Sequence, residues 1–337
     1  MVEYGPTIGD EPIPMTRREV LLLSAAMTVP RFVLAQQMGS SPIGVLDPTH
    51  GSQQSTLAAL REGLEDAAYR SYMPVEYRWT GWTDNRFDPL LTLAIDLVIR
   101  DVGVIVTGNL NGIRAAKAAT SSIPIVFFAG RDVIEAGLIE SADRPGGNLA
   151  GIVIPSEGDL KQLDLLTKLL PQARGIALLV NPHSKAAETQ IQEMQEAAWS
   201  IGVELKILQA SAEGDFEADF ASLAKLHVAG LVVGADPLFD NSREQLVSLA
   251  ARYAMPAIYG WREFADVGGL ISYGPSRSGI WRQAGLYAGN ILKGAKPVDL
   301  PLQKPKRFEL VVNLRTAKSL GLTIPQSILG YTDEVIE

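Results

Sequence analysis

The chain contains no cysteine among its 337 residues. This absence excludes disulfide bonds, thiolate nucleophiles and a lipid anchor on an N-terminal cysteine. Basic residues are fewer than acidic ones, 30 against 38, and the net charge of −8 opposes nonspecific nucleic-acid binding. Only three histidines occur, His50, His183 and His227, and none has the paired spacing of metal ligands. We therefore predict no metal, no cofactor and no nucleic-acid partner.

The common catalytic motifs are also missing. The segment Gly274 to Gly279 has the wrong spacing for a GxSxG nucleophile elbow, and Ser276 there suits a helix cap. No GxxxxGK[ST] phosphate loop occurs, and the segment Thr107 to Gly112 is not GxGxxG. We therefore expect a protein that is not an enzyme.

The first 35 residues are predicted to be an export signal. Arg17 and Arg18 precede an apolar run from Val20 to Val29, and Val33-Leu34-Ala35 suits a cleavage site. Roughly ten apolar residues are too few to span a bilayer, and no run of about 20 follows. The paired arginines approximate the twin-arginine type of signal, and Met15 offers an alternative start. This pattern predicts a periplasmic protein without direct membrane insertion, exported by the twin-arginine or the general secretory route.

After this segment, short runs rich in Val and Ile alternate with amphipathic stretches, which is typical of parallel sheets covered by helices. The strands are predicted at 43–46, 75–79, 104–107, 125–128, 152–154, 176–180, 204–208, 231–233, 257–259, 270–273 and 308–312. Helices with apolar spacings of three and four are predicted at 57–69, 89–100, 160–170, 186–201, 242–253 and 279–292. A turn at 144–148 separates two similar halves. The fold class is therefore α/β, with two doubly wound parallel-sheet lobes.

A set of polar residues follows the predicted strands, where loops of an open parallel sheet gather around a ligand. The set is Thr49, His50, Asn109, Asp132, Asn181, Asp236 and Tyr273. Asn and Asp at these positions also suit helix caps and turns, and the two interpretations are compatible. Several aromatic residues fall at or just past strand ends, of which Trp82 and Tyr273 are the candidates for covering a ligand. The others are Trp79, Phe128, Tyr259 and Trp261.

From about residue 42 to the C-terminus, the chain resembles the substrate-binding proteins of bacterial ABC importers of the tryptophan/tyrosine-uptake-like type. The matching stretches include Arg144-Pro-Gly-Gly-Asn148, Pro256-Ala-Ile-Tyr-Gly260, Gly268-Gly-Leu-Ile-Ser-Tyr-Gly274 and Phe308-Glu-Leu-Val-Val-Asn313. The resemblance implies a type I periplasmic binding fold whose chain crosses three times between lobes. We expect the crossings near Ile152, Gly269 and Val298. The first lobe is then 41–151 plus 270–297, and the second is 152–269 plus 298–337.

Two positions depart from what is usual in that family. Gly108-Asn109-Leu110 stands where a small turn containing Ser or Thr is usual, and Arg131-Asp132 stands where Gly-Asp is usual. An arginine facing the ligand could bind a carboxylate through two parallel hydrogen bonds, so Arg131 joins the predicted binding residues.

The leading hypothesis is an extracytoplasmic receptor that closes on a small carboxylate-bearing ligand, an amino acid or an aromatic or branched carboxylate, and delivers it to a membrane permease. Helix N-termini after Thr49, Asn109 and Asn181 would hold the anion, and Asp236 would take an ammonium or hydroxyl group. Two alternatives use the same fold: an exported hydrolase with Asp132 and Asp236 as paired carboxylates, and a ligand-sensing domain.

Overall fold

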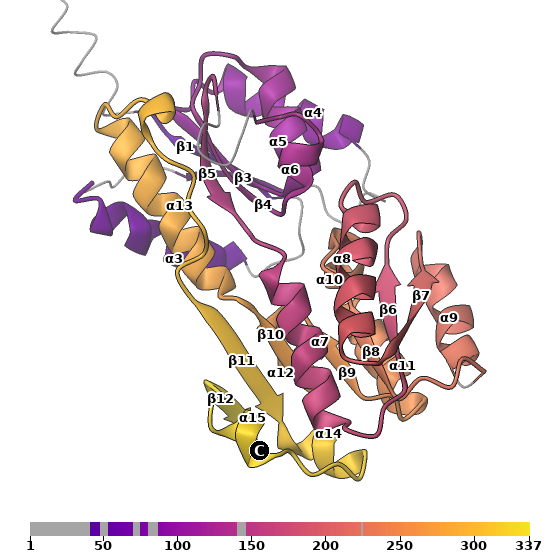
Figure 1. Cartoon of the computed structure of the whole chain (residues 1–337). Coiled ribbons are helices and arrows are strands. Elements are labelled where there is room, and N and C mark those ends of the chain that lie inside the picture. Colours follow the sequence, from indigo (N-terminus) through magenta and orange to yellow (C-terminus); the bar gives the residue numbers. More distant parts are fainter. Residues whose placement is uncertain (1–40, 48–52, 70–74, 80–86, 140–145, 224) are drawn as a thin grey trace, which may run out of the picture. The chain divides into compact units, whose positions relative to one another are not determined.

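The strands form two separate sheets in the computed structural model, which describes residues 41–47, 53–69, 75–79, 87–139, 146–223 and 225–337 (Figure 1). Every strand predicted from the sequence is present among them, with ends shifted by at most a few residues. The predicted α/β alternation is thus the observed order of elements.

The first sheet is five-stranded, entirely parallel, and ordered β2-β1-β3-β4-β5. Its strands are β1 (Ile43–Asp47), β2 (Val75–Trp79), β3 (Val104–Gly108), β4 (Ile125–Ala129) and β5 (Leu149–Val153). The apolar side chains of α3 (Gln53–Asp66) and α13 (Arg277–Leu292) pack on one face, and those of α4 (Phe87–Ile99) and α5 (Asn109–Ala119) on the other. The short helix α6 (Asp132–Glu135) follows β4. We call this sheet and these helices the first lobe.

The second sheet is seven-stranded and ordered β12-β11-β10-β9-β8-β6-β7, with β10 and β11 antiparallel and the other pairs parallel. Its strands are β6 (Gly175–Val180), β7 (Glu204–Gln209), β8 (Gly230–Val233), β9 (Ala257–Tyr259), β10 (Ile271–Pro275), β11 (Phe308–Asn313) and β12 (Glu334–Ile336). These strands and the helices packed on them form the second lobe.

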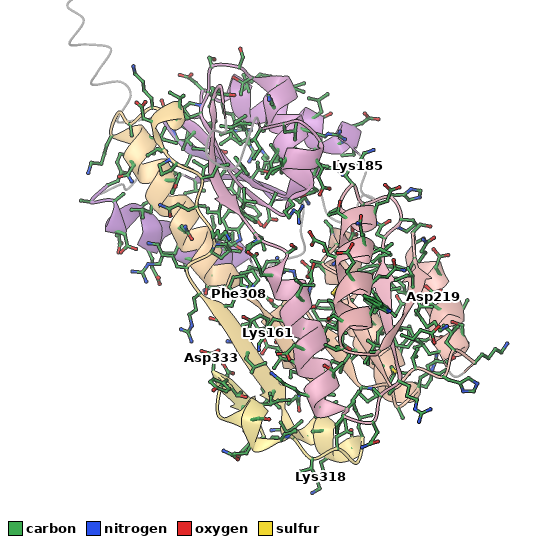
Figure 2. All side chains as sticks on the ribbon, in the orientation of Figure 1. Lys161, Lys185, Asp219, Phe308, Lys318 and Asp333 are labelled. Carbon is green, nitrogen blue, oxygen red and sulfur yellow. The ribbon has the colours of Figure 1, made fainter. Side chains whose placement is uncertain are left out.

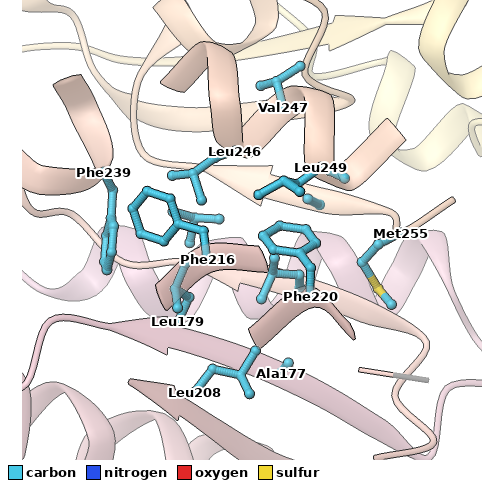
Figure 3. Close-up of a cluster of buried hydrophobic side chains, with 14 of the residues drawn as sticks. Ala177, Leu179, Leu208, Phe216, Phe220, Phe239, Leu246, Val247, Leu249 and Met255 are labelled. Atoms are coloured by element: carbon cyan, nitrogen blue, oxygen red, sulfur yellow. The ribbon is translucent and has the colours of Figure 1, made fainter. Parts of the chain in front are cut away.

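Apolar clusters cover both faces of this second sheet, as expected for strands that are buried on both sides. One cluster involves α7 (Glu157–Leu169), α8 (Ala187–Ser200), α14 (Leu314–Ser319) and α15 (Gln326–Leu329). The other involves α9 (Phe216–Leu223), α10 (Pro237–Asn241), α11 (Arg243–Arg252) and α12 (Arg262–Asp266). Figure 3 shows part of this second cluster, where Phe216, Phe220 and Phe239 lie among aliphatic side chains. Single 3₁₀ turns occur at η1 (Glu213–Asp215) and η2 (Pro297–Asp299).

Glycine allows α3 and α13 to approach very closely in the first lobe. A Cβ atom on Gly63 would lie 1.8 Å from the carbonyl oxygen of Arg282, and one on Gly285 would lie 2.1 Å from that of Leu60. The two backbones therefore touch where they cross, which brings α13 against a helix more than 200 positions earlier in the sequence.

The chain passes between the sheets at 154–156, at Ser276 and at 304–307. Backbone hydrogen bonds connect these segments to each other and to the first sheet: Ser276 N–H donates to Arg307 O at 3.2 Å, and Ile154 N–H donates to Ala129 O at 2.8 Å. The second and third crossings are thus adjacent in space, and the first crossing is attached to the end of β4.

Strand pairing corrects the expected crossing positions in three places. Ile152 pairs with Phe128 inside the first sheet, so the first crossing follows β5 and does not precede it. Residues 271–275, expected in the first lobe, pair with β9 and β11 in the second, and only α13 packs on the first. Gln303, expected in the second lobe, hydrogen-bonds to Gly151 and Val153 of β5. Strand pattern alone does not say which neighbour a strand takes, because it gives the burial of each residue and not the strand beside it.

Candidate functional site

The carboxyl ends of the parallel strands carry the polar residues of the candidate site. In the first lobe, β1 ends at Asp47, Asn109 follows β3, and Asp132 follows β4 by three residues. In the second lobe, Asn181 follows β6 and Asp236 follows β8 by three residues. Loops at this edge of an open parallel sheet are where ligands bind.

Asn181 and Asp236 are in direct contact. The Asn181 side-chain amide donates to Asp236 Oδ1 at 3.1 Å, and the same oxygen accepts the backbone N–H of Leu238 at 2.9 Å as the N-cap of α10. The Asn181 side-chain oxygen accepts the N–H of His183 at 3.0 Å. Burial raises the pKa of Asp236, which these two hydrogen bonds partly offset. Both residues are turn or cap residues, and they also place a partly buried carboxylate at the edge of the sheet.

Asp132 brings a second carboxylate from the first lobe to this region. Burial, together with the negative charges of Glu135 and Asp236, raises its pKa to about 6, against hydrogen bonds from backbone N–H groups. Asp132 is therefore within electrostatic reach of Asp236 across the two lobes. Two carboxylates that repel each other favour a bound cation or a shared proton between them.

Arg131 is engaged by acidic groups of the chain itself. Its guanidinium donates to the Glu193 carboxylate on α8 and to Ser156 Oγ at 3.3 Å, and it lies 4.0 Å from Glu135 Oε1. The expected clamp on a ligand carboxylate would therefore have to compete with Glu193 for the same donors.

Asn109 shapes the turn between β3 and α5. Its φ of 53° is in the left-handed region that Asn tolerates, and its side-chain oxygen accepts the N–H of Gly112 at 3.0 Å. Gly108 lies against the ring of Phe128, which a Cβ atom would approach to 2.5 Å. This turn thus sets the N-terminus of α5 at the edge of the first sheet.

Tyr273 is used mainly for packing within the second lobe. Its ring stacks on Phe308 with centroids 5.7 Å apart, and its carbonyl accepts a hydrogen bond from Gln162 on α7 at 2.8 Å. Figure 2 shows Phe308 beside the N-terminal part of α7, where a Cβ atom on Gly158 would lie 3.2 Å from the Phe308 ring. The face of the Tyr273 ring that meets Phe308 is therefore already covered by the protein.

The structure adds a charged aromatic cluster that the sequence analysis did not select. The Arg277 guanidinium lies 4.2 Å from the centroid of the Trp261 ring and pairs with Asp240 at 2.8 Å and Glu263 at 2.9 Å. Burial lowers the pKa of Arg277, but the charges of Asp240 and Glu263 outweigh it and hold that pKa above its usual value. Asp47 of the first lobe also acts electrostatically on Arg277, which places the cluster near the same edge. The one feature of the sequence that pointed to this cluster was the position of Trp261 just past β9.

Three predicted residues, Thr49, His50 and Trp82, and the predicted export signal lie outside the described residues. Among the residues that are described, no three His, Asp or Glu side chains are grouped to hold a metal ion. Nor does any helix in that part of the chain combine the length and apolar character needed to cross a membrane.

A small pocket lies elsewhere, near the starts of β9 and β10, and is lined by α11, α14 and the loop before β10. Its lining contains no charged side chain, and Tyr259, Thr316 and Ser319 are its main polar groups. It lies near the amino ends of β9 and β10, away from the carboxyl-end loops.

Comparison with known proteins identifies the relatives of the chain. It is 25% identical over 274 residues to a tyrosine-binding protein of Clostridioides difficile, which covers 81% of this chain and 78% of that protein. A Streptococcus pneumoniae ABC domain in complex with L-Trp superposes with a TM-score of 0.79 at 23% identity, covering 88% of this chain and all of that one. A conserved domain protein of Vibrio cholerae gives 0.78 at 22% identity over 88% and 99%.

These structural matches confirm the predicted fold class, because the neighbours are two-lobed type I periplasmic binding proteins. Residues 43–336 match the family described as ABC transporter substrate binding protein, which covers most of the chain. The chain therefore belongs to the ABC transporter substrate binding protein family.

Proposed function

We propose that this protein is an extracytoplasmic receptor that binds a small amino acid with an aromatic side chain between the carboxyl edges of its two sheets and delivers it to the permease of an ABC importer. The observation that carries the proposal is the pair of partly buried carboxylates, Asp132 and Asp236, which come from different lobes, with the charge of Asp236 raising the pKa of Asp132. Membership of the family and the tyrosine-binding relative support the ligand class.

The charge balance favours an ammonium group as the main ionic contact of the ligand. Among the residues with described side chains, the two arginines at this edge are matched, Arg131 by Glu193 and Arg277 by Asp240 and Glu263. Asp132 and Asp236 differ from these acidic partners of arginine. In the contacts described above, their carboxylates accept hydrogen bonds only from backbone N–H groups or from the Asn181 amide. A cation between them removes their mutual repulsion, so binding is more favourable for an ammonium than for an anion.

The remaining contacts follow from the surrounding groups. The ligand carboxylate would accept hydrogen bonds from backbone N–H groups at the start of α5, positioned by Asn109, and from the Asn181 loop. The Trp261 ring, held on one side by Arg277, would stack on the aromatic side chain of the ligand. Thr49, His50, Trp82 and Tyr273 stay in the proposal as residues that complete the enclosure.

Closure would be a hinge motion about the three crossings, driven by contacts that the ligand makes to both lobes at once. No bond of the ligand changes in this scheme. Conversion of the bound ligand into a product would instead favour the hydrolase that uses Asp132 and Asp236 as paired carboxylates.

Calorimetric titration with L-tyrosine, L-tryptophan, L-phenylalanine and the matching aromatic carboxylates without an amine would test the proposal. We expect binding of at least one amino acid and, for Asp236→Asn, a loss of roughly tenfold or more in affinity, since a charge-assisted hydrogen bond contributes about 1.5–3 kcal/mol. Asp219→Asn is the matched control, because Asp219 is another carboxylate of raised pKa and lies on α9. Preference for the amine-free carboxylates, or equal affinity of Asp236→Asn and the unmodified protein, would contradict it.

A further inference from the structure

A single guanidinium connects both lobes and one of the crossings. Arg131 follows β4 in the first lobe, Ser156 lies in the first crossing, and Glu193 lies on α8 in the second lobe. All three meet in the structure. Their contact depends on how the two sheets are placed against each other, because Arg131 and Glu193 belong to elements on opposite sides of the crossings.

The backbone around each partner is well fixed within its own lobe. Arg131 is the N-cap residue of α6, and its carbonyl accepts the N–H of Ile134 at 2.9 Å. Glu193 stands one turn beyond Gln190, whose amide donates to Asp159 Oδ2 at 2.9 Å and ties α8 to α7. Because each backbone segment is held within its own lobe, bending at the crossings would separate the two charges.

We propose that the Arg131–Glu193 ion pair is a latch that holds the lobes together before the ligand arrives, so that affinity is set partly by two residues that do not touch the ligand. This inference goes beyond the proposed function, since it concerns the ligand-free protein. The pair is partly exposed, with 40% and 31% of the side chains accessible, so it shifts the closed-to-open ratio by about two- to fivefold. A latch of that strength biases the equilibrium and still allows opening.

The absence of native cysteine permits a direct test. Spin labels on Ala118→Cys, exposed on α5, and Glu244→Cys, exposed on α11, report the distance between lobes in ligand-free protein by pulsed electron resonance. We expect Glu193→Gln to move part of the distribution to longer values. About 0.5 M salt, which screens exposed charges, should do the same to the unmodified protein and leave Glu193→Gln unchanged.

Reversing the pair distinguishes a latch from a local structural effect. The double variant Arg131→Glu/Glu193→Arg should restore the shorter distances that each single variant loses. Glu217→Gln is the control, because it breaks the ion pair with Arg252 within the second lobe. Unchanged distances in a folded Glu193→Gln protein, with or without salt, would overturn the latch. Because no ligand is present, this outcome is independent of whether aromatic amino acids bind.

Discussion

Asp132 is partly buried, and its charged form is held at a net cost in stability at neutral pH. Burial, with the charges of Glu135 and Asp236, raises the pKa of this carboxyl from an ordinary 3.8 to about 6. The unfolded chain then releases the proton at lower pH than the folded protein does. Stability contributed at this position is therefore present below about pH 4 and lost as the pH rises to about 6.

At the residue scale we therefore predict that Asp132→Asn stabilises the protein at pH 8 by about 1–2 kcal/mol and changes stability little at pH 4. The amide keeps an acceptor for the backbone N–H groups and carries no charge to bury. Urea unfolding at the two pH values would measure the difference.

Asp215→Asn is the opposite-sign control, because backbone N–H groups of Ser211 and Ala212 hold the pKa of Asp215 below its usual value. That variant should lose stability at pH 8. A destabilised Asp132→Asn protein at pH 8 would show that its carboxylate is needed in charged form within the ligand-free fold.

At the scale of elements, the crossing of α3 and α13 leaves no room for a side chain. We predict that Gly63→Ala destabilises the protein by about 2–3 kcal/mol, because its Cβ would meet the backbone of Arg282, which cannot rotate away. Gly214→Ala, where nothing lies within 4 Å, should stay within about 0.5 kcal/mol of the unmodified protein. Urea unfolding followed by circular dichroism would compare them, and equal losses would refute the close-crossing argument.

Elements with regular apolar patterns were predictable from the sequence, whereas α5 was not. Its segment begins with Asn109 in a left-handed conformation and contains Gly112, which are residues typical of turns. The short helices α10 and α12 also lack a full apolar period. Tertiary contacts complete these elements, as when Phe239 on α10 packs beside Phe216 in the core of the second lobe.

Some residues of the candidate site, but not their contacts, could likewise be predicted from the sequence. Strand-end positions pointed to Asp132, Asn181 and Asp236, which the structure brings within electrostatic or hydrogen-bond reach. The partners in the ion pairs could not be predicted from the sequence. Arg131 pairs with Glu193, 62 positions away, and Arg277 pairs with Asp240, 37 positions away. Such pairs depend on the placement of whole sheets, which local pattern does not encode.

For the whole molecule, the C-terminal segment completes the second lobe. Leu310, Val312, Ile324 and Ile328 are buried in its core, and together they contribute roughly 6–12 kcal/mol, comparable to the total stability of a typical domain. We predict that a chain ending at Lys306 does not fold its second sheet, while a chain ending at Asp333, which lacks only β12, does. Amide hydrogen exchange would compare the protection of the second sheet in the two chains. Protected amides in β6 and β8 of the shorter chain would contradict the prediction.

The contact between α3 and α13 also bears on the order in which the molecule is built. Leu60 and Leu64 on α3 are covered by a helix that begins at Arg277, so the lobe that is synthesised first can finish its core only after most of the chain exists. Contacts of such long sequence separation form slowly. The first lobe of the nascent protein therefore remains incomplete until α13, which lies in the last fifth of the chain, has been made.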